Sequence, residues 1–259
     1  MLSKIFFGLA AVSAVMASPI VPDIDFTPDT LQEAQDLLKF LQDVDAQRTS
    51  LNQTEWEELL TSNGILLSPP PIDHDFLNFT ADVDVDVDVS VDKRQSCKNT
   101  QSTKITKVET FLDWDIQMSN VVCARSSDFV IDVSAGWSVA NSITVSGSIT
   151  PYFASSFLYG SVGVDFGKTW TSSASNLNRA TILAGNCGAM ILRPTTTRRY
   201  GEQRSGCVGS TKVIGTFMAD DRLSAQFNGV KWTGGAVSDC QKKQASPPMS
   251  RCNGGGNFI

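Results

Sequence analysis

The stretch FVIDVSAGWSVANSITVSGSI, residues 129–149, decides the expected fold because its apolar and polar residues alternate. The odd positions from Phe129 to Ile149 are mostly apolar, and the even positions are mostly serine, threonine and aspartate. Alternation with a period of two is typical of a β-strand with one apolar and one polar face. Since a strand usually has about 5–6 residues, alternation over about twenty predicts an unusually long one.

A second alternating segment, residues 158–175, follows a short connection at Thr150-Pro151. Two matched strands joined in this way predict an antiparallel hairpin. Its tip is rich in aromatic residues, whereas an exposed tip normally carries glycine, asparagine or aspartate. Aromatic side chains at a tip either enter a core or meet an apolar partner such as a membrane interface. The candidate membrane or partner contacts are therefore Tyr152, Phe153, Phe157 and Tyr159.

The rest of the chain after residue 94 is also rich in strand signals. The sequence predicts two short strands around a turn at residues 185–188, and two or three more strands up to Cys240. No segment after Arg94 has a comparable helical pattern. The predicted fold class is mainly β, as an elongated antiparallel sheet or sandwich with a long hairpin, in one domain spanning residues 95–259.

The first 94 residues have the features of segments that are removed. Residues 1–17 resemble a secretory signal peptide that is cut after Ala17, and no later run is long and apolar enough for a helical anchor. Lys93-Arg94 follows a polar stretch and predicts cleavage by a dibasic-specific, kexin-like protease. We therefore expect an acidic leader, residues 18–94, and a secreted, extracellular product that begins at Gln95.

Cysteine and charge both change at Arg94. Residues 1–94 contain 17 acidic and 5 basic residues, a net charge of −12, and residues 95–259 contain 10 acidic and 16 basic residues, a net charge of +6. The leader either screens the mature surface or simply has a different composition. An even number of cysteines in a secreted domain predicts disulfides, without fixing their pairing; the six are Cys97, Cys123, Cys187, Cys207, Cys240 and Cys252.

Helical periodicity and glycosylation signals lie only in the leader. Residues 27–61 have a helical pattern that starts with a Thr-Pro cap, including a second short helix from Thr54 to Leu60. Residues 65–94 are predicted to be a solvated, protease-accessible linker. Their Val-Asp run favours a linker over a calcium site, because it lacks the glycine and glutamate of an EF-hand loop. The N-glycosylation acceptors are Asn52 and Asn78.

Catalysis has few candidates after Arg94. His74 is the only histidine in the sequence and lies in the leader, so a product cut at Arg94 contains no triad of the usual histidine-dependent kind. We expect no enzymatic activity, no cofactor and no metal. One alternative is a β-rich hydrolase that uses only carboxylates, and its candidates would be Glu109, Glu202, Asp113, Asp115, Asp220 and Asp221.

Four arginines within twelve residues form a candidate anion contact. They are either a group that binds an anionic lipid surface or part of a solvated loop between disulfide-bonded strands. No aromatic signature of nucleic-acid binding accompanies them, so nucleic acid is not an expected partner. These arginines are Arg193, Arg198, Arg199 and Arg204.

The long hairpin also has two interpretations. It can lie between two layers of a sandwich, or it can insert into a membrane as a transmembrane β-hairpin, for which about 9–11 residues per strand suffice. Its polar face is rich in hydroxyl groups and almost without charge, which suits both. Lys168 lies among the apolar positions and argues against a clean lipid-facing strand.

The alternating pair 129–149 and 158–175, followed by LAGNCGAMILRP, is similar to aerolysin-like β-pore-forming domains. The order of signal peptide, acidic leader, Lys-Arg pair and cysteine-rich β product resembles small secreted effector-like proteins of filamentous fungi. The resemblance implies an elongated antiparallel β fold, an activity directed at other cells, and assembly into a homo-oligomer in the pore-forming case. It supplies no catalytic residues.

The predicted function is that of a secreted, proteolytically matured effector or toxin-like protein without enzymatic activity. Its expected partners are the maturation protease and an anionic membrane or host surface. The alternative is a secreted module that binds a glycan or a host protein through exposed aromatic residues and the arginines.

Overall fold

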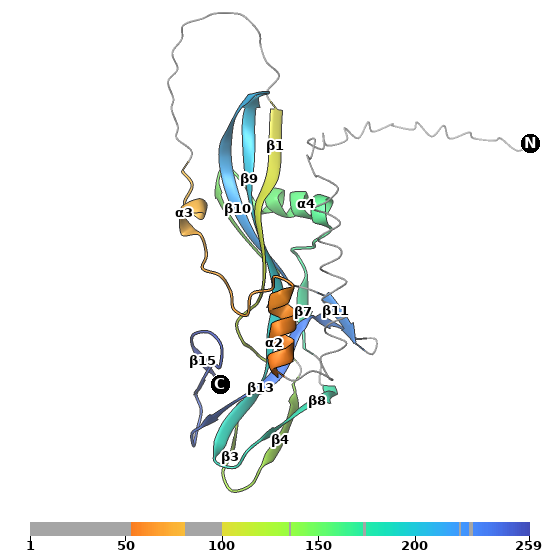
Figure 1. Ribbon diagram of the computed structural model, residues 1–259, viewed down its shortest axis with the longest axis vertical. Helices are drawn as coiled ribbons and strands as arrows, with labels where there is room; N and C mark the ends of the chain where they lie inside the picture. Colours follow the sequence, from red (N-terminus) through yellow and green to blue (C-terminus); the bar gives the residue numbers. More distant parts are fainter. Residues whose placement is uncertain (1–52, 81–99, 135, 173–174, 223, 228–229) are drawn as a thin grey trace, which may run out of the picture.

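The chain folds around one long, twisted antiparallel sheet (Figure 1). The computed structural model describes residues 53–80 and 100–259, except residues 135, 173–174, 223 and 228–229. The helices are α2 (Gln53–Ser62), α3 (His74–Leu77) and α4 (Pro151–Val162), and the strands are β1 (Thr100–Leu112), β2 (Ile116–Gln117), β3 (Val122–Ala124), β4 (Phe129–Val133), β5 (Ser138–Ala140), β6 (Ser142–Gly147), β7 (Thr169–Thr171), β8 (Ser175–Ile182), β9 (Asn186–Cys207), β10 (Ser210–Arg222), β11 (Ser224–Phe227), β12 (Val230–Thr233), β13 (Gly235–Lys243), β14 (Met249–Ser250) and β15 (Asn257–Phe258).

Strand β9 is the axis of the sheet. Its 22 residues extend over about 70 Å at ~3.3 Å per residue. Residues 186–194 pair with β13 on one side and with β2 and β3 on the other, and residues 195–207 pair with β1 and β10. The mainly β, elongated antiparallel fold that the sequence predicts is thus confirmed.

The predicted strand 129–149 is correct in type but not continuous. It is divided into β4, β5 and β6, which pair with β8, β7 and β10 in turn. Gly136 has a φ of 97°, a left-handed conformation that a strand does not continue through. Asn141 separates β5 from β6, and its buried side chain bonds to the main chain of Asp165 and Arg222. Of the predicted hairpin, only the pairing of β5 with β7 and the Val133–Ser175 pair join the two predicted strands. The rest of β4 pairs with residues 179–182, which come after the predicted second strand.

The predicted hairpin tip is wrong, because residues 151–162 form helix α4. Thr150 caps the helix by accepting a hydrogen bond from the Phe153 amide, and Pro151 occupies the first turn. Gly163 ends the helix in the left-handed conformation. Leu158 and Phe157 pack with Phe217 of β10, so α4 covers one face of the sheet (Figure 1).

The region from residue 183 to 207 also differs from its prediction. Its turn lies at residues 183–185, where Asn186 donates to the Leu183 carbonyl, and not at 185–188. The arginine-rich segment after Pro194 belongs to β9 and is not a loop. Successive polar side chains of this segment point to opposite faces of the sheet.

The other end of the molecule holds two further cores and two disulfides. One core lies between β9 and the β4–β8 pair, around Met190 and Ile182. The other joins β9 and β13 to the C-terminal β14–β15 pair. The described disulfides are Cys123–Cys187 and Cys240–Cys252. Among the described residues, none of the helices combines the length and apolarity that crossing a bilayer requires.

Candidate functional site

Residues 53–80, the described part of the expected leader, pack on the sheet that residues 100–259 form. Leu66 pairs with Phe111 as an isolated parallel bridge on β1, the edge strand. Before this point, Trp56 and Leu60 of α2 pack with Leu112. Because Phe111 and Leu112 point to opposite faces of β1, the leader crosses the strand edge and continues on the other face. We call residues 65–77 the strap and the sheet face under it the strap face.

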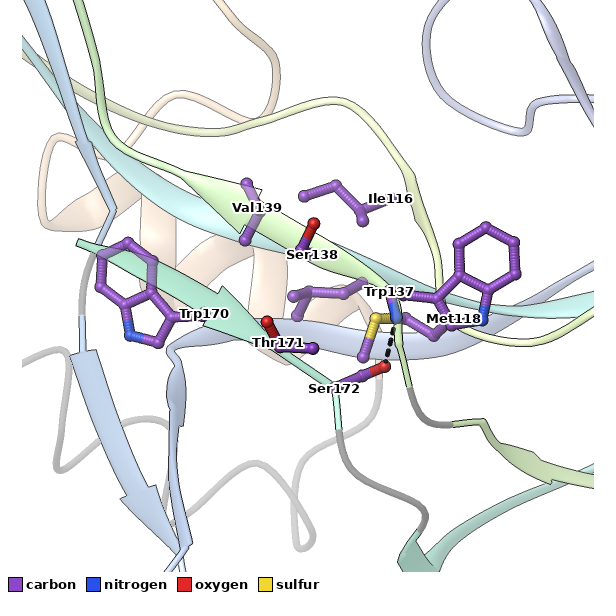
Figure 2. Close-up of a pocket in the computed structure, with 9 residues that line it drawn as sticks. Ile116, Met118, Trp137, Ser138, Val139, Trp170, Thr171 and Ser172 are labelled. Carbon is purple, nitrogen blue, oxygen red and sulfur yellow. Dashed lines mark hydrogen bonds between the residues drawn. The ribbon is translucent and has the colours of Figure 1, made fainter. Parts of the chain in front are cut away.

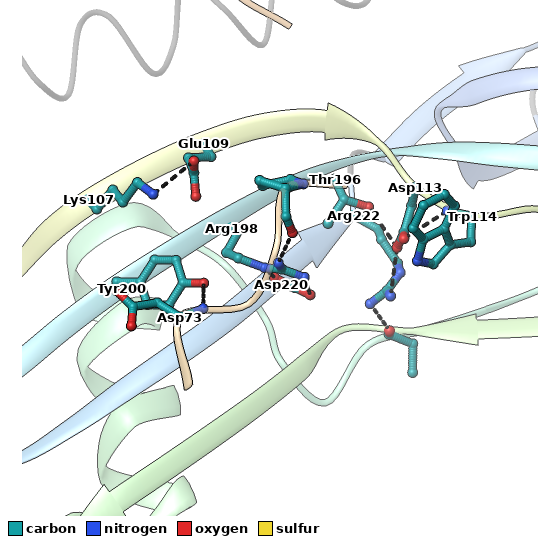
Figure 3. Close-up of polar contacts among 12 residues, drawn as sticks. Asp73, Lys107, Glu109, Asp113, Trp114, Thr196, Arg198, Tyr200, Asp220 and Arg222 are labelled. Carbon is teal, nitrogen blue, oxygen red and sulfur yellow. Dashed lines mark hydrogen bonds and ion pairs between the residues drawn. The ribbon is translucent and has the colours of Figure 1, made fainter. Parts of the chain in front are cut away.

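Arg198 is the central side chain of the strap face. It is only 5% exposed, and it donates two hydrogen bonds to Asp220, Nε–Oδ1 at 2.7 Å and Nη2–Oδ2 at 2.8 Å (Figure 3). The guanidinium lies 5.0 Å from the Phe111 ring centroid. Burial opposes the charge on Arg198, but the hydrogen bonds and charge of Asp220 outweigh burial and raise its pKa. The remaining Nη1 donates to the Pro70 carbonyl of the strap at 3.1 Å.

Tyr200, two residues along β9, makes the next contact with the strap. Its hydroxyl oxygen accepts a hydrogen bond from the Asp73 amide at 3.1 Å (Figure 3). The Phe76 and Tyr200 rings form a T-shaped contact with 5.5 Å between their centroids. Lys107 lies 5.7 Å from the Tyr200 ring and forms a 2.9 Å ion pair with Glu109. The strap therefore rests on an aromatic ring that is flanked by charge.

Two more contacts hold the strap at its ends. Thr216 of β10 donates to the Phe76 carbonyl at 2.8 Å. Arg193 donates to the Leu67 carbonyl and, at 3.3 Å, to the Asp113 carbonyl. Burial lowers the pKa of Arg193, and nearby carboxylates oppose this shift.

The face opposite the strap face carries a second buried ion pair. Arg199 Nη1 lies 3.4 Å from Asp221 Oδ2, and Asn141 donates to the other carboxylate oxygen at 3.3 Å. Burial lowers the pKa of Arg199 and raises the pKa of Asp221, and the charge of each partner only partly offsets this effect.

The four candidate arginines thus lie along one strand and have internal partners. Arg204 completes the set, since it pairs with Glu202 at 3.0 Å and donates to the main chain of Thr211. Arg198 and Arg199 are buried, so an anion could not reach them in this state. The predicted arginine-rich loop is instead part of strand β9. Because neighbouring residues of a strand point to opposite faces, Arg198 and Arg199 lie on different faces of the sheet.

The four candidate aromatic residues are divided by helix α4. Phe157 is buried against Phe217 and Phe153 is half-buried, whereas Tyr152 and Tyr159 are 81% and 65% exposed. The two tyrosines are seven positions apart, which places them on the same side of the helix. Only these two are available to a partner.

The carboxylates considered for hydrolysis are also engaged. Asp113 accepts from Arg222 at 3.2 Å and from Thr196 at 3.3 Å. Asp115 accepts from the main chain and side chain of Asn253. Glu202 pairs with Lys104 and Arg204. One carboxylate oxygen of Glu109 is buried without a hydrogen-bond partner. Fixed partners of this kind favour a structural role for the group.

Cysteine chemistry supports the disulfide interpretation. Cys207 is disulfide-bonded in addition to the two pairs above, and none of the described cysteines is free. Asp115 lies close to Cys240 and Cys252 in a group with metal-ligand spacing, but both sulfurs are joined in a disulfide. Cys97 lies outside the described residues.

Several features that the sequence predicts also lie outside the described residues. These are the signal peptide with Ala17, the helical pattern before residue 53, the acceptor Asn52, the Val-Asp run after residue 81, and the cut site Lys93-Arg94. Asn78 is described and lies exposed at the end of α3.

A small cavity lies between the β5–β7 pair and β9 (Figure 2). Trp137, Trp170 and Met118 contribute to its lining, and Ser172 accepts a 2.9 Å hydrogen bond from the Trp137 amide. Its volume of about 10 Å³ holds roughly one water, whereas ligand pockets usually measure about 300–1,000 Å³. We therefore place the candidate site on the strap face and not in this cavity.

Comparisons of the chain with protein-family models, with curated proteins and with solved structures found no match. The likeness to aerolysin-like domains and to fungal effectors therefore stays a prediction that rests on the sequence pattern.

Proposed function

We propose that the protein is a secreted factor without enzymatic activity that acts on the cells or surfaces of another organism. In this proposal a protease cuts after Arg94, and the leader covers the working face until then. The observation that carries it is the strap, which occupies Arg198 and Tyr200 with its own main chain. These contacts support a covering role for the leader.

The energetics of the leader support a role in folding as well. Trp56, Leu60 and Ile65 are buried against Leu112, and burial of one such side chain stabilises a fold by about 1.5–3 kcal/mol. The opposite net charges of leader and mature part, −12 and +6, add an attraction that salt weakens. Removal of the leader would leave a basic surface suited to anionic membranes.

The experiment compares the wild-type chain with a Lys93→Ala/Arg94→Ala double variant. Intact-mass spectrometry identifies the start of each secreted product, and flotation and dye release are measured with neutral and anionic vesicles. We expect a wild-type product that begins at Gln95, binds anionic vesicles and loses this binding at high salt. The uncut variant should stay unbound.

Equal vesicle binding by both products would contradict the masking role. A wild-type product that still carries residues 18–94 would contradict maturation at Arg94. Release of dye would mean that the protein makes the membrane permeable. Binding without release would mean that the protein only attaches to the membrane surface.

A binding module for a glycan or a host protein is the second candidate, and the exposed pair Tyr152 and Tyr159 favours it. Aromatic side chains with this exposure are typical of recognition surfaces. The Tyr152→Ser/Tyr159→Ser double variant should fold normally, because neither ring belongs to the core. Loss of attachment to a panel of immobilised glycans or cell surfaces would identify α4 as the contact.

A further inference from the structure

The strap is bound through main-chain atoms at every third residue. Arg193 contacts the carbonyl of Leu67, Arg198 that of Pro70, Tyr200 the amide of Asp73, and Thr216 the carbonyl of Phe76. Main-chain atoms are common to every polypeptide. Residues 69–73 are neither helix nor strand, whereas Phe76 lies in helix α3. The contacts up to Asp73 therefore recognise the course of a non-helical chain more than its particular side chains.

The contacts recur every three residues, which is the repeat of a polyproline II helix, and three consecutive prolines lie at the centre of the strap. Pro69, Pro70 and Pro71 carry no helix or strand assignment. Proline fixes φ near −65° and biases the residue before it towards extended conformations. Polyproline II has three residues per turn and no internal hydrogen bonds, so its carbonyls are free to accept from a partner.

The strap face has donors and a ring that are fixed in advance. The two Asp220 bonds and the Phe111 ring hold the Arg198 guanidinium, so that Nη1 points to the strap. Tyr200, 2% exposed, presents its hydroxyl and its ring to the same segment. Grooves that recognise proline-rich segments combine aromatic rings with hydrogen-bonding groups. On this face Arg198 bonds the Pro70 carbonyl and the Tyr200 ring meets Phe76 of α3.

We infer that the strap face is a binding site for an extended, proline-containing polypeptide of a partner protein, and that residues 65–77 occupy it as a built-in ligand. The inference rests on the proposed function, because a partner needs the leader to leave. In the uncut chain the strap is tethered to its site and competes at a high effective concentration. A cut after Arg94 turns it into a separate chain that dilution can remove.

The probe is a fluorescein-labelled peptide of residues 64–80, and its binding is measured by fluorescence anisotropy. The folded full chain is cut in vitro with a dibasic-specific protease, and the leader fragment is followed by size-exclusion chromatography and mass spectrometry. We expect the cut protein to bind the peptide and the Lys93→Ala/Arg94→Ala variant not to bind it. A peptide of unrelated sequence around the same three prolines should also bind, and replacement of Pro69–Pro71 by glycine should weaken binding at least ~10-fold.

Tyr200→Phe tests the face itself. It removes the hydroxyl that accepts the Asp73 amide and keeps the ring, so peptide affinity should fall about 3–10-fold. Ser126→Ala removes an exposed hydroxyl between β3 and β4, so it is the control and should leave affinity unchanged.

Three results would overturn the inference. These are a folded, cut protein that has lost the leader and binds no peptide, a cut protein that retains the leader and exchanges no peptide, and a face that binds the leader peptide but not the unrelated proline peptide. Because these measurements use protein that is cut in vitro, they are independent of whether the chain matures at Arg94 or acts on vesicles.

Discussion

At the scale of single residues, the sheet depends on charged side chains in places where an apolar core is usual. Arg198 and Asp220 are both buried and form two hydrogen bonds with each other. A buried pair adds little net stability over apolar residues, but removal of one partner leaves an uncompensated charge. The pair therefore fixes the geometry of the strap face more than it stabilises the fold.

The Asp220→Ala variant should lower the free energy of unfolding by about 3–5 kcal/mol, because it leaves the buried Arg198 charge without its partner. Chemical denaturation of the uncut protein measures this change. Asp132→Ala is the control, since Asp132 pairs with Arg179 at the surface, and an exposed pair contributes about 0–1 kcal/mol. Equal losses in the two variants would show that the Arg198 pair is not buried in solution.

Asp221 predicts a pH dependence. Burial raises its pKa in the folded state, above a value of ~3.9 in the unfolded chain. Between these two pKa values the folded state binds more protons, so this group's contribution to stability is largest below the unfolded value and is lost as pH rises through the folded value. The free energy of unfolding of the wild type, minus that of the Asp221→Asn variant, should therefore fall as the pH rises from 3. Chemical denaturation at several pH values measures this difference, and a difference that grows with pH would contradict the raised pKa of Asp221.

At the scale of elements, the strand type was predictable but the strand partners were not. Alternation identifies extended backbone in residues 129–149, yet it carries no information about which strand pairs with which. Gly136 and Asn141 are the points where partners change, and both are also residues typical of interruptions. The α4 helix was predictable in principle, since Thr150-Pro151 and Gly163 are the same start and stop signals that indicate the helix after Thr27.

The part of β9 after Pro194 escaped prediction for a different reason. TTTRRYGEQR has no apolar alternation, because its buried positions are filled by arginines whose partners, Asp220 and Asp221, come 22 residues later. Pairing across strands is not visible in a local pattern. The candidate arginines were thus correctly singled out as special, but their strand, their burial and their contacts with the leader required the structure.

Gly201 gives the element-scale prediction. It lies opposite Phe217 across β9 and β10, and a Cβ atom there would lie 2.2 Å from the Phe217 ring and 2.8 Å from the Lys104 carbonyl. Gly201→Ala should therefore lower the melting temperature, with a loss of about 1–3 kcal/mol from overpacking. Gly160→Ala is the control, because Gly160 lies in α4 with open space around its Cβ position and should gain about 0.5–1 kcal/mol. The same sign for both changes would argue against close packing at Gly201.

At the scale of the whole molecule, the described residues on the two sides of the expected cut after Arg94 pack together. The sequence predicts a boundary at Arg94 from charge, cysteine content and periodicity, and predicts a solvated linker from residue 65. The described part of that linker, up to residue 80, instead lies on the sheet and includes the buried Ile65. Composition identifies where a chain changes character, but it does not say whether the two parts touch.

The helix α2 offers the last test of this unity. Trp56 is 4% exposed in the cluster with Leu60, Ile65 and Leu112, and truncation of a buried tryptophan costs about 3–5 kcal/mol. If the leader is integral to the fold, Trp56→Ala should destabilise the uncut chain by roughly this amount and should speed release of the leader after cleavage, as size-exclusion chromatography would show. Glu58→Ala, at an exposed position of the same helix, should leave both properties nearly unchanged. Only the buried face of α2 contacts the sheet. Identical behaviour of the two variants would therefore mean that α2 does not pack there in solution, and it would contradict the masking role.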